Sequence, residues 1–141
     1  MKNLILVIVA SVLFSLNVSA QTYNVPANVK HAFSQKFSKA TGVKWGKEGK
    51  TEWEAEFKMD GKKYSANFNL NAVWLETEYS ITVAEIPAAI KTLIDKDYAG
   101  YKIKVSEVSE TAKGKEFEIT FVKGKKSFEV VFSEDGKIIK K

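Results

Sequence analysis

The sequence predicts an α+β protein built from two tandem repeats, each a helix followed by four antiparallel strands. Two observations favour this fold. A hairpin pattern of alternating apolar and polar residues occurs twice with a constant offset of 64 positions, and each copy follows an amphipathic segment that starts at a proline. A unit of about 60 residues buries little apolar surface alone. We therefore expect the two repeats to form one continuous sheet with both helices on one face.

The first 20 residues have the features of a cleaved signal peptide. Lys2 supplies a positive start, the run over 4–16 is mostly apolar, and small residues at 18–20 are typical of a cleavage site. The apolar run is shorter than the roughly 20 residues that a membrane-spanning helix needs. We expect a periplasmic or secreted protein without membrane insertion after cleavage. Its single domain would span 21–141, with repeat one at about 23–80 and repeat two at about 81–141.

Repeat one is expected to begin with a helix. Pro26 stands where the first helical position tolerates a missing N–H. The apolar residues that follow, Val29, Phe33 and Phe37, are four positions apart, which is the spacing of one helix face. A short strand near 43–45 comes next.

The hairpin of repeat one spans 51–70. Asp60 and Gly61 tolerate the positive φ angles of a two-residue type I′ turn, and such a turn would place Phe57 opposite Tyr64. A slip of one residue would carry the aromatic side chains to solvent. A second turn at 71–72 and a strand over 73–79 complete the repeat. The side chains expected to face inward are Trp53, Ala55, Phe57, Met59, Tyr64, Ala66, Phe68 and Leu70.

Repeat two follows the same order. Pro87 precedes a second amphipathic helix, and a strand near 103–105 precedes the second hairpin. Gly124-Lys125 has the glycine-first composition of a type II′ turn. A turn at 134–136 and a strand over 137–140 end the chain. The inward residues expected here are Ile86, Ile90, Leu93, Ile94 and Tyr98 on the helix, and Phe117, Ile119, Phe121, Phe128, Val130 and Phe132 on the hairpin.

These features resemble the PepSY-like family described as β-lactamase-inhibitor-like. The resemblance covers about residues 23–140 and rests on the Val-Pro and Ile-Pro helix starts, WEAEF at 53–57, NLNAVWLETE at 69–78 and FSEDGKII at 132–139. It implies a small exported α+β protein with tandem helix-plus-sheet repeats, like an inhibitor that presents a concave sheet face to β-lactamase. Asn71-Ala72 departs from the Asp-Gly of many relatives. Lactamase inhibition is not implied, because no interface motif can be carried over residue by residue.

Composition excludes several classes of function. The chain has no cysteine, which excludes thiol catalysis and thiolate metal sites. His31 is the only histidine and lies off the apolar stripe of the first helix, so a histidine triad or a histidine-rich metal site is excluded. All basic residues are lysines, which lack the guanidinium fork that reads guanine. The net charge of +5 therefore indicates a solvated surface and does not favour nucleic-acid binding.

The outward side of the first hairpin is the candidate site. In the expected register Glu52, Glu54 and Glu56 lie across from Asn69, Asn67 and Ser65, which makes a polar ladder. This ladder is either a solvated sheet face, a partner-binding surface or a hard-cation site built from oxygens. Trp74 adds a further candidate, because the 73–79 strand has apolar residues on both parities and could expose an aromatic anchor. Its alternative is a strand buried on both sides.

The sequence thus predicts a non-enzymatic exported binding module without a cofactor. A protein or peptide partner in the cell envelope would be held on the sheet surface, and the residues expected to contact it are Glu52, Glu54, Glu56, Asn67, Asn69 and Trp74. The alternative is a small-ligand or calcium-responsive envelope protein, with the turns at 69–71 and 133–135 as candidate contacts. The sequence leaves the oligomeric state open.

Overall fold

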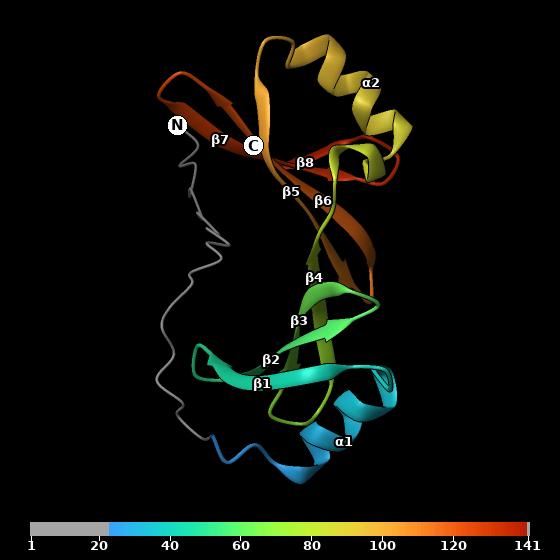
Figure 1. Cartoon of the computed structure of the whole chain (residues 1–141), viewed down its shortest axis with the longest axis vertical. Helices are drawn as coiled ribbons and strands as arrows, with labels where there is room; N and C mark the ends of the chain where they lie inside the picture. Colours follow the sequence, from blue (N-terminus) through green and yellow to red (C-terminus); the bar gives the residue numbers. More distant parts are fainter. Residues whose placement is uncertain (1–22, 141) are drawn as a thin grey trace, which may run out of the picture.

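A computed structural model describes residues 23–140, and the expected signal peptide lies outside them. Two helices and eight strands follow one another in the predicted order, with one short 3₁₀ helix between the repeats (Figure 1). Repeat one contains α1 (Ala27–Lys36), β1 (Thr41–Glu48), β2 (Glu52–Met59), β3 (Lys62–Asn69) and β4 (Trp74–Ser80). Repeat two contains η1 (Val83–Glu85), α2 (Ala88–Asp97), β5 (Lys102–Thr111), β6 (Gly114–Lys123), β7 (Lys126–Ser133) and β8 (Ile138–Lys140).

All eight strands form one antiparallel sheet in the sequential order β1 to β8. The two repeats therefore join edge to edge through β4 and β5, which pair over Glu76–Ser80 and Glu107–Thr111. This confirms the predicted continuous sheet.

The predicted hairpin register is confirmed. Phe57 pairs with Tyr64 and Trp53 pairs with Phe68. The turn between them has positive φ angles at both central residues, 50° at Asp60 and 80° at Gly61, as a type I′ turn requires. In the second hairpin Gly124 has a φ of 60°, as a glycine-first turn requires.

The prediction that Leu70 faces inward is wrong. β3 ends at Asn69, and Leu70 is 50% exposed. The chain leaves the sheet here because the Asn69 side-chain oxygen accepts hydrogen bonds from the backbone N–H groups of Asn71 (2.9 Å) and Val73 (3.0 Å). Such an asparagine-centred turn replaces the strand ladder with local hydrogen bonds.

The repeats match closely but not at one offset throughout. β3 and β7 have the same length and start 64 residues apart, whereas α1 and α2 start 61 residues apart, as do β1 and β5. The three extra residues of repeat two lie in the β5–β6 hairpin, whose strands have ten residues each against eight in β1 and β2. The longer hairpin extends the sheet surface of repeat two.

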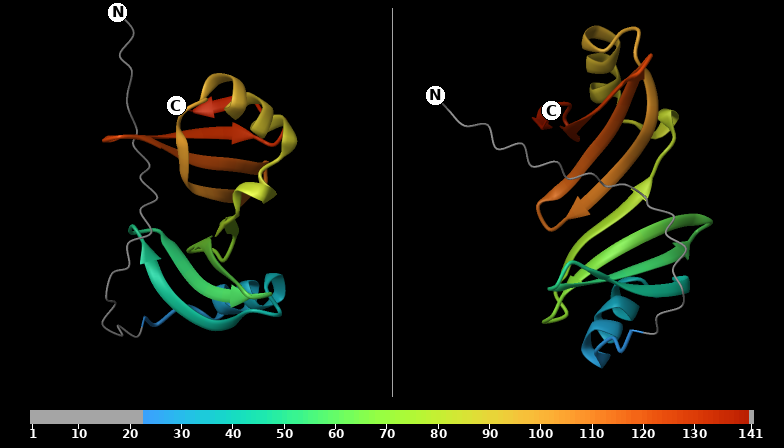
Figure 2. Two further views of the ribbon diagram at one scale, coloured as in Figure 1. Left: turned by 45° about the horizontal axis from the view of Figure 1, so that its top comes forward. Right: turned by 90° about the vertical axis from the view of Figure 1, so that its left-hand side faces the viewer.

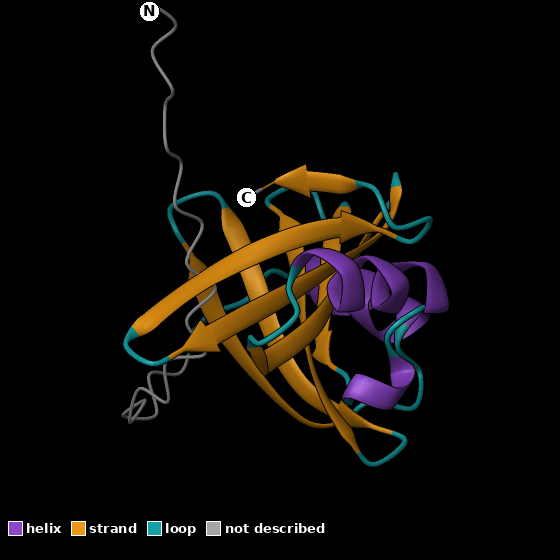
Figure 3. Cartoon of the chain, turned by 90° about the horizontal axis from the view of Figure 1, so that it is seen from above, coloured by secondary structure: helices purple, strands orange, loops and turns teal. Residues whose placement is uncertain are grey.

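Each helix covers its own half of the sheet. Val29 and Phe33 of α1 pack on Phe57 and Phe68, and the Phe33 ring centroid lies 5.1 Å from that of Phe57. Seen from above, α1 and α2 lie on the same side of the sheet (Figure 3). The equivalent core under α2 comprises Ile86, Ile90, Tyr98, Val108, Phe117, Ile119, Phe121, Val130 and Phe132. The prediction of both helices on one face is confirmed.

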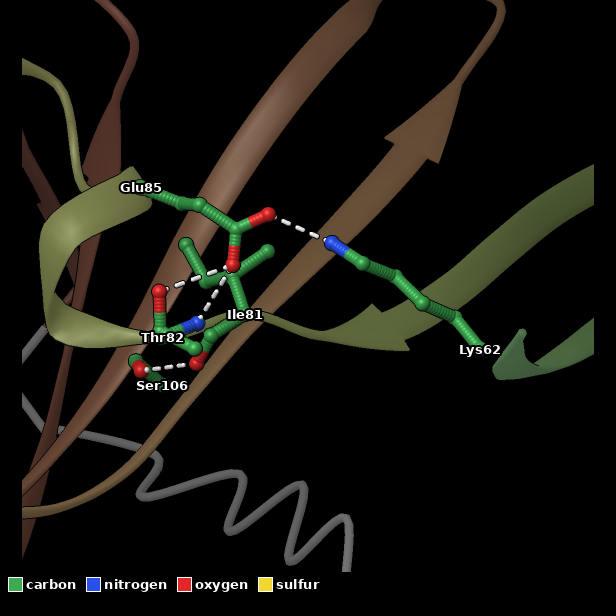
Figure 4. A network of polar contacts seen from close by, with 5 residues as sticks. All are labelled: Lys62, Ile81, Thr82, Glu85 and Ser106. Atoms are coloured by element: carbon green, nitrogen blue, oxygen red, sulfur yellow. Dashed lines mark hydrogen bonds and ion pairs between the residues drawn. The ribbon is translucent and has the colours of Figure 1, made fainter. Parts of the chain in front are cut away.

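A polar network connects the repeats at η1, an element that the sequence pattern did not predict (Figure 4). The Glu85 carboxylate accepts hydrogen bonds from the Thr82 backbone N–H (2.8 Å) and hydroxyl (2.9 Å) and pairs with Lys62 of repeat one. The Lys62 ammonium and these Thr82 donors lower the pKa of Glu85 to about 2. Ser106 of β5 donates to the Ile81 carbonyl at 2.7 Å and fixes the chain that leads into η1.

The sheet is bent along its length. The β1–β2 hairpin and the β6–β7 hairpin reach to the same side, and both helices lie on the outside of the bend (Figures 1 and 2). The side without helices is therefore the inner side of the curved sheet.

Candidate partner-binding face

Ten glutamates gather on the helix-free side of the sheet. Alternation sets this placement, because each glutamate is adjacent in its strand to a residue that faces the helices. Together they make up ten of the chain's 17 acidic residues. We call this surface the acidic face, and its carboxylates belong to Glu48, Glu52, Glu54, Glu56, Glu76, Glu78, Glu107, Glu116, Glu118 and Glu129.

The sheet register brings glutamates from both repeats together. One row of directly paired residues crosses five strands, from Glu56 on β2 to Glu116 on β6, with Ser65, Glu78 and Ser109 between them. Residues that pair directly in an antiparallel sheet share a face and lie about 5 Å apart at Cβ. The acidic face is therefore continuous across the boundary between the repeats.

Two neighbouring rows widen this surface. Glu54 pairs with Asn67, which pairs with Glu76, and the Ser109 hydroxyl donates a hydrogen bond to the Glu76 carboxylate. On the other flank, Glu107 of β5 pairs directly with Glu118 of β6. Like charges placed directly opposite one another destabilise a sheet. Repulsion between these glutamates therefore destabilises the folded state at this surface.

Lysines do not neutralise the acidic face. Among residues 23–140 the ion pairs are Lys62–Glu85, Lys115–Glu110 and Lys137–Asp135, and none of them involves a carboxylate of this face. The lysines that share the helix-free side lie at its margins, on β1, at the β2–β3 turn, at the start of β5 and on β8. The centre of the acidic face thus has carboxylates without a cationic partner in the part of the chain that the structure describes.

Burial and mutual repulsion raise the pKa values of the central glutamates. Partial burial, followed by the charges of Glu76 and Glu118, raises the pKa of Glu78 to about 7. Partial burial, followed by Glu129 and Glu107, raises the pKa of Glu118 to about 7. Glu54 and Glu107 also have raised pKa values, with burial as the main cause. Both effects favour the neutral carboxyl, so this face changes charge near neutral pH.

Five of the six predicted contact residues lie at the repeat-one end of this surface. Glu52, Glu54 and Glu56 pair with Asn69, Asn67 and Ser65 in the predicted register. Asn67 lies between Glu54 and Glu76, and its side-chain oxygen is buried without a hydrogen-bond donor among the described residues. Asn69 also pairs with Glu52, but its side-chain oxygen closes the turn to β4 and is occupied by backbone donors.

Trp74, the sixth predicted contact, lies on the opposite side of the sheet. Its indole N–H donates to the Thr77 hydroxyl at 2.9 Å, and the Lys36 ammonium of α1 lies 3.6 Å from the ring centroid. The cause is a register shift between β3 and β4, where Asn67 pairs with Glu76 but Phe68 pairs with Trp74. The extra residue, Leu75, reverses the alternation, so Trp74 packs beside the core of α1.

Sequence reasoning missed five members of the face: Glu48, Glu76, Glu78, Glu107 and Glu129. The glutamates of β4 alternate with other residues, but the sequence did not show which side of the sheet they occupy. This strand has apolar residues at both odd and even positions, and its bulge against β3 was not predicted. Glu48 lies beyond the strand expected near 43–45, and Glu107 required the pairing of the long β5 and β6 strands. Glu129 was identifiable by its alternation with Phe128 and Val130 on β7. Glu116 and Glu118 followed from the repeat.

The turns considered for calcium use their oxygens internally. In the turn after β7 the Ser133 hydroxyl accepts from the Lys137 backbone N–H at 3.1 Å, and the Asp135 carboxylate pairs with Lys137 at 2.7 Å. These contacts lower the pKa of Asp135 to about 2, the Lys137 ammonium being the largest cause. Within residues 23–140 no group of three or more carboxylates or histidines is arranged to hold a metal ion.

A groove lies on the helix side, at the junction of the repeats. It has a volume of about 420 Å³ and an aromatic floor that includes Tyr64, Tyr79 and Phe117. Lys62 and Glu85 line it as well. Lys62 and Glu85 form an ion pair with one another, unlike the unpaired carboxylates of the acidic face.

Among residues 23–140 no helix has the length and apolar character of a membrane span.

The structure is similar to that of a BLIP-like protein from Bacteroides fragilis, with a TM-score of 0.75, 26% sequence identity and coverage of 84% of this chain and 86% of that one. It is also similar to a DUF2874 family protein from Bacteroides ovatus (TM-score 0.77, 20% identity, 84% and 86% covered) and to a "putative periplasmic" protein from Bacteroides eggerthii (0.76, 19%, 84% and 88%).

No curated protein is significantly similar to this chain. The model of the family described as "Putative beta-lactamase-inhibitor-like, PepSY-like" matches residues 51–140, which span the first hairpin, the junction and all of repeat two. That match covers more than half of the sequence and includes most strands of the acidic face. The chain therefore belongs to the PepSY-like family.

Proposed function

We propose that this protein is an exported, non-enzymatic binding module that holds a cationic segment of a protein or peptide partner on the acidic face. The observation that carries the proposal is the row across five strands that contains Glu56, Glu78 and Glu116, none of which forms an ion pair among residues 23–140. Complementary potentials of this kind set partner choice and speed association.

The energetic state of the face supports the proposal. Half-buried carboxylates that repel one another destabilise the free protein, and Glu78 and Glu118 resist ionisation for this reason. A bound lysine- or arginine-rich segment would remove both the repulsion and the unmet hydrogen-bonding capacity. Like charges that are half-buried next to one another without cationic partners are typical of functional sites.

The shape of the sheet supports a macromolecular partner. The acidic face is broad, lies on the inner side of the bend and has no helix over it (Figure 2). Such a surface suits a protruding loop or an extended segment of another protein. The mechanism would be occlusion or sequestration of that segment, which agrees with the inhibitor-like description of the family.

The test is affinity capture from an envelope fraction with residues 21–141 as bait. At about pH 8, where these carboxyls are mostly ionised, we expect Glu54→Gln/Glu78→Gln/Glu118→Gln to lose a saturable partner that the wild-type bait retains, because the variant removes three central charges without adding bulk. The matched control, Asp95→Asn/Asp97→Asn/Glu134→Gln, changes the net charge equally at exposed positions outside the face and is expected to keep the partner.

Three results would contradict the proposal. One is capture of the same partner by both triple variants. A second is equal loss in both variants, since net charge alone would then explain the interaction. Resistance of the captured complex to about 0.5 M salt would also contradict it, because screening at that ionic strength weakens contacts between exposed charges.

A further inference from the structure

Five lysines gather at the far end of repeat two, beyond the acidic face. β5 begins there and the β6–β7 hairpin turns there, and the hairpin projects beyond the rest of the sheet (Figure 2). All five lysines of this region are exposed and none takes part in an ion pair within the described residues. We call this group the lysine end, and it comprises Lys102, Lys104, Lys123, Lys125 and Lys126.

The lysines of the lysine end repel one another. Solvation alone does not require lysines to be placed so close together. Lys123 and Lys126 pair directly across the hairpin, and like charges in this position destabilise a sheet. The last turn of α2 adds Asp95, Lys96 and Asp97, which leaves the region strongly cationic. This end therefore favours an anionic ligand.

Aromatic side chains lie among these lysines. Phe128 is 36% exposed, its ring centroid lies 5.2 Å from that of Tyr101, and the Lys123 ammonium lies 5.3 Å from the Tyr101 ring. Aromatic rings beside lysines suit the boundary between lipid headgroups and acyl chains, where apolar parts are buried and ammonium groups remain in water.

We propose that the lysine end docks the protein on an anionic phospholipid surface. The region projects and does not form a cleft, so it matches a flat surface better than it matches a single enclosed anion. Binding would be peripheral and electrostatic, and lysines close to such a surface contribute about fivefold each to the affinity. The negative membrane would repel the acidic face, which leaves that face available to other molecules.

The test is cosedimentation of residues 21–141 with phosphatidylcholine vesicles that contain or lack phosphatidylglycerol. We expect binding only to the anionic vesicles and a loss of about 100-fold in Lys123→Gln/Lys125→Gln/Lys126→Gln, from fivefold per lysine. The matched control, Lys30→Gln/Lys39→Gln/Lys50→Gln, removes the same charge from exposed positions in repeat one and should bind within about twofold of wild type.

The proposal would be overturned by a lack of binding to anionic vesicles, by equal binding to neutral vesicles, or by equal losses in both triple variants. Release of the protein from vesicles by millimolar inorganic phosphate would instead indicate a site for free phosphate and would also overturn it. Phe128→Ala should also weaken vesicle binding, although it leaves the charge unchanged, because it removes an aromatic ring. Unaltered thermal unfolding of each variant would confirm that it is folded.

Discussion

Phe121→Ala is expected to lower the free energy of unfolding by about 3–5 kcal/mol, the range for truncating a buried phenylalanine. Phe121 is fully buried beneath α2, and its ring stacks on that of Tyr98 with centroids 4.6 Å apart. A domain of this size is stable by only about 5–15 kcal/mol. The variant should therefore unfold at a much lower denaturant concentration, measured by circular dichroism in urea.

Phe128 provides a matched control for this prediction. It pairs directly with Phe121 across the β6–β7 hairpin but is 36% exposed. Phe128→Ala should cost much less, because the solvent already reaches much of its ring and a smaller cavity is left. Equal losses in the two variants would show that the core of repeat two is not organised around Phe121.

A rise in pH from about 5.5 to 8 is expected to increase the affinity for a cationic peptide about tenfold. Glu78 and Glu118 have pKa values of about 7, so both change from mostly neutral to mostly ionised over this range. Each new charge pair at a partly exposed site contributes up to about 1 kcal/mol, and 1.4 kcal/mol is tenfold. Calorimetric titration with an oligolysine peptide at low salt would measure the change.

The stability of the free protein should change with pH in the opposite direction. The pKa values of Glu78 and Glu118 are raised above their ordinary value of 4.5, so the folded protein binds more protons than the unfolded chain between about pH 4.5 and 7. Stability is therefore lost as the pH rises through this window. Below it, stability should fall again as Glu85 and Asp135, whose pKa values are lowered to about 2, become protonated.

Glu78→Gln/Glu118→Gln isolates the cause of both effects. The unfolding temperature of the variant and its affinity for oligolysine should depend much less on pH between about 5 and 8, because it has no carboxyl to titrate at these positions and only the raised pKa values of Glu54 and Glu107 remain. A variant that retained the wild-type slope of thermal stability would show that other groups produce it.

The repeat made much of the fold predictable from the sequence. The turn Asp60-Gly61 admits one register that keeps the aromatic residues together, and the offset to repeat two transfers that register to Phe117 and Phe121. Single hairpins are determined by local chemistry in this way. For the same reason the repeat-one part of the acidic face was predictable, since Glu54 and Glu56 alternate with buried residues.

The remaining features depend on tertiary structure. The bulge at Leu75 moves Trp74 to the helix side, and no residue type in the sequence requires a bulge there. The position of Glu78 beside Glu118 arises from the pairing of β4 with β5, which are separated by a helix and share no turn. Thus the sequence indicated an acidic ladder, and only the joined sheet makes it one surface across both repeats.

The central claim is that a cationic partner occupies the acidic face, and amide chemical-shift mapping tests it most directly. Nitrogen-15-labelled residues 21–141 would be titrated with oligolysine at about pH 8, where the carboxylates are ionised. We expect the largest shifts on β2, β4 and β6, at and beside Glu54, Glu78 and Glu118. Shifts centred instead on the groove at Tyr64 and Tyr79, or the same pattern in Glu54→Gln/Glu78→Gln/Glu118→Gln, would contradict the account.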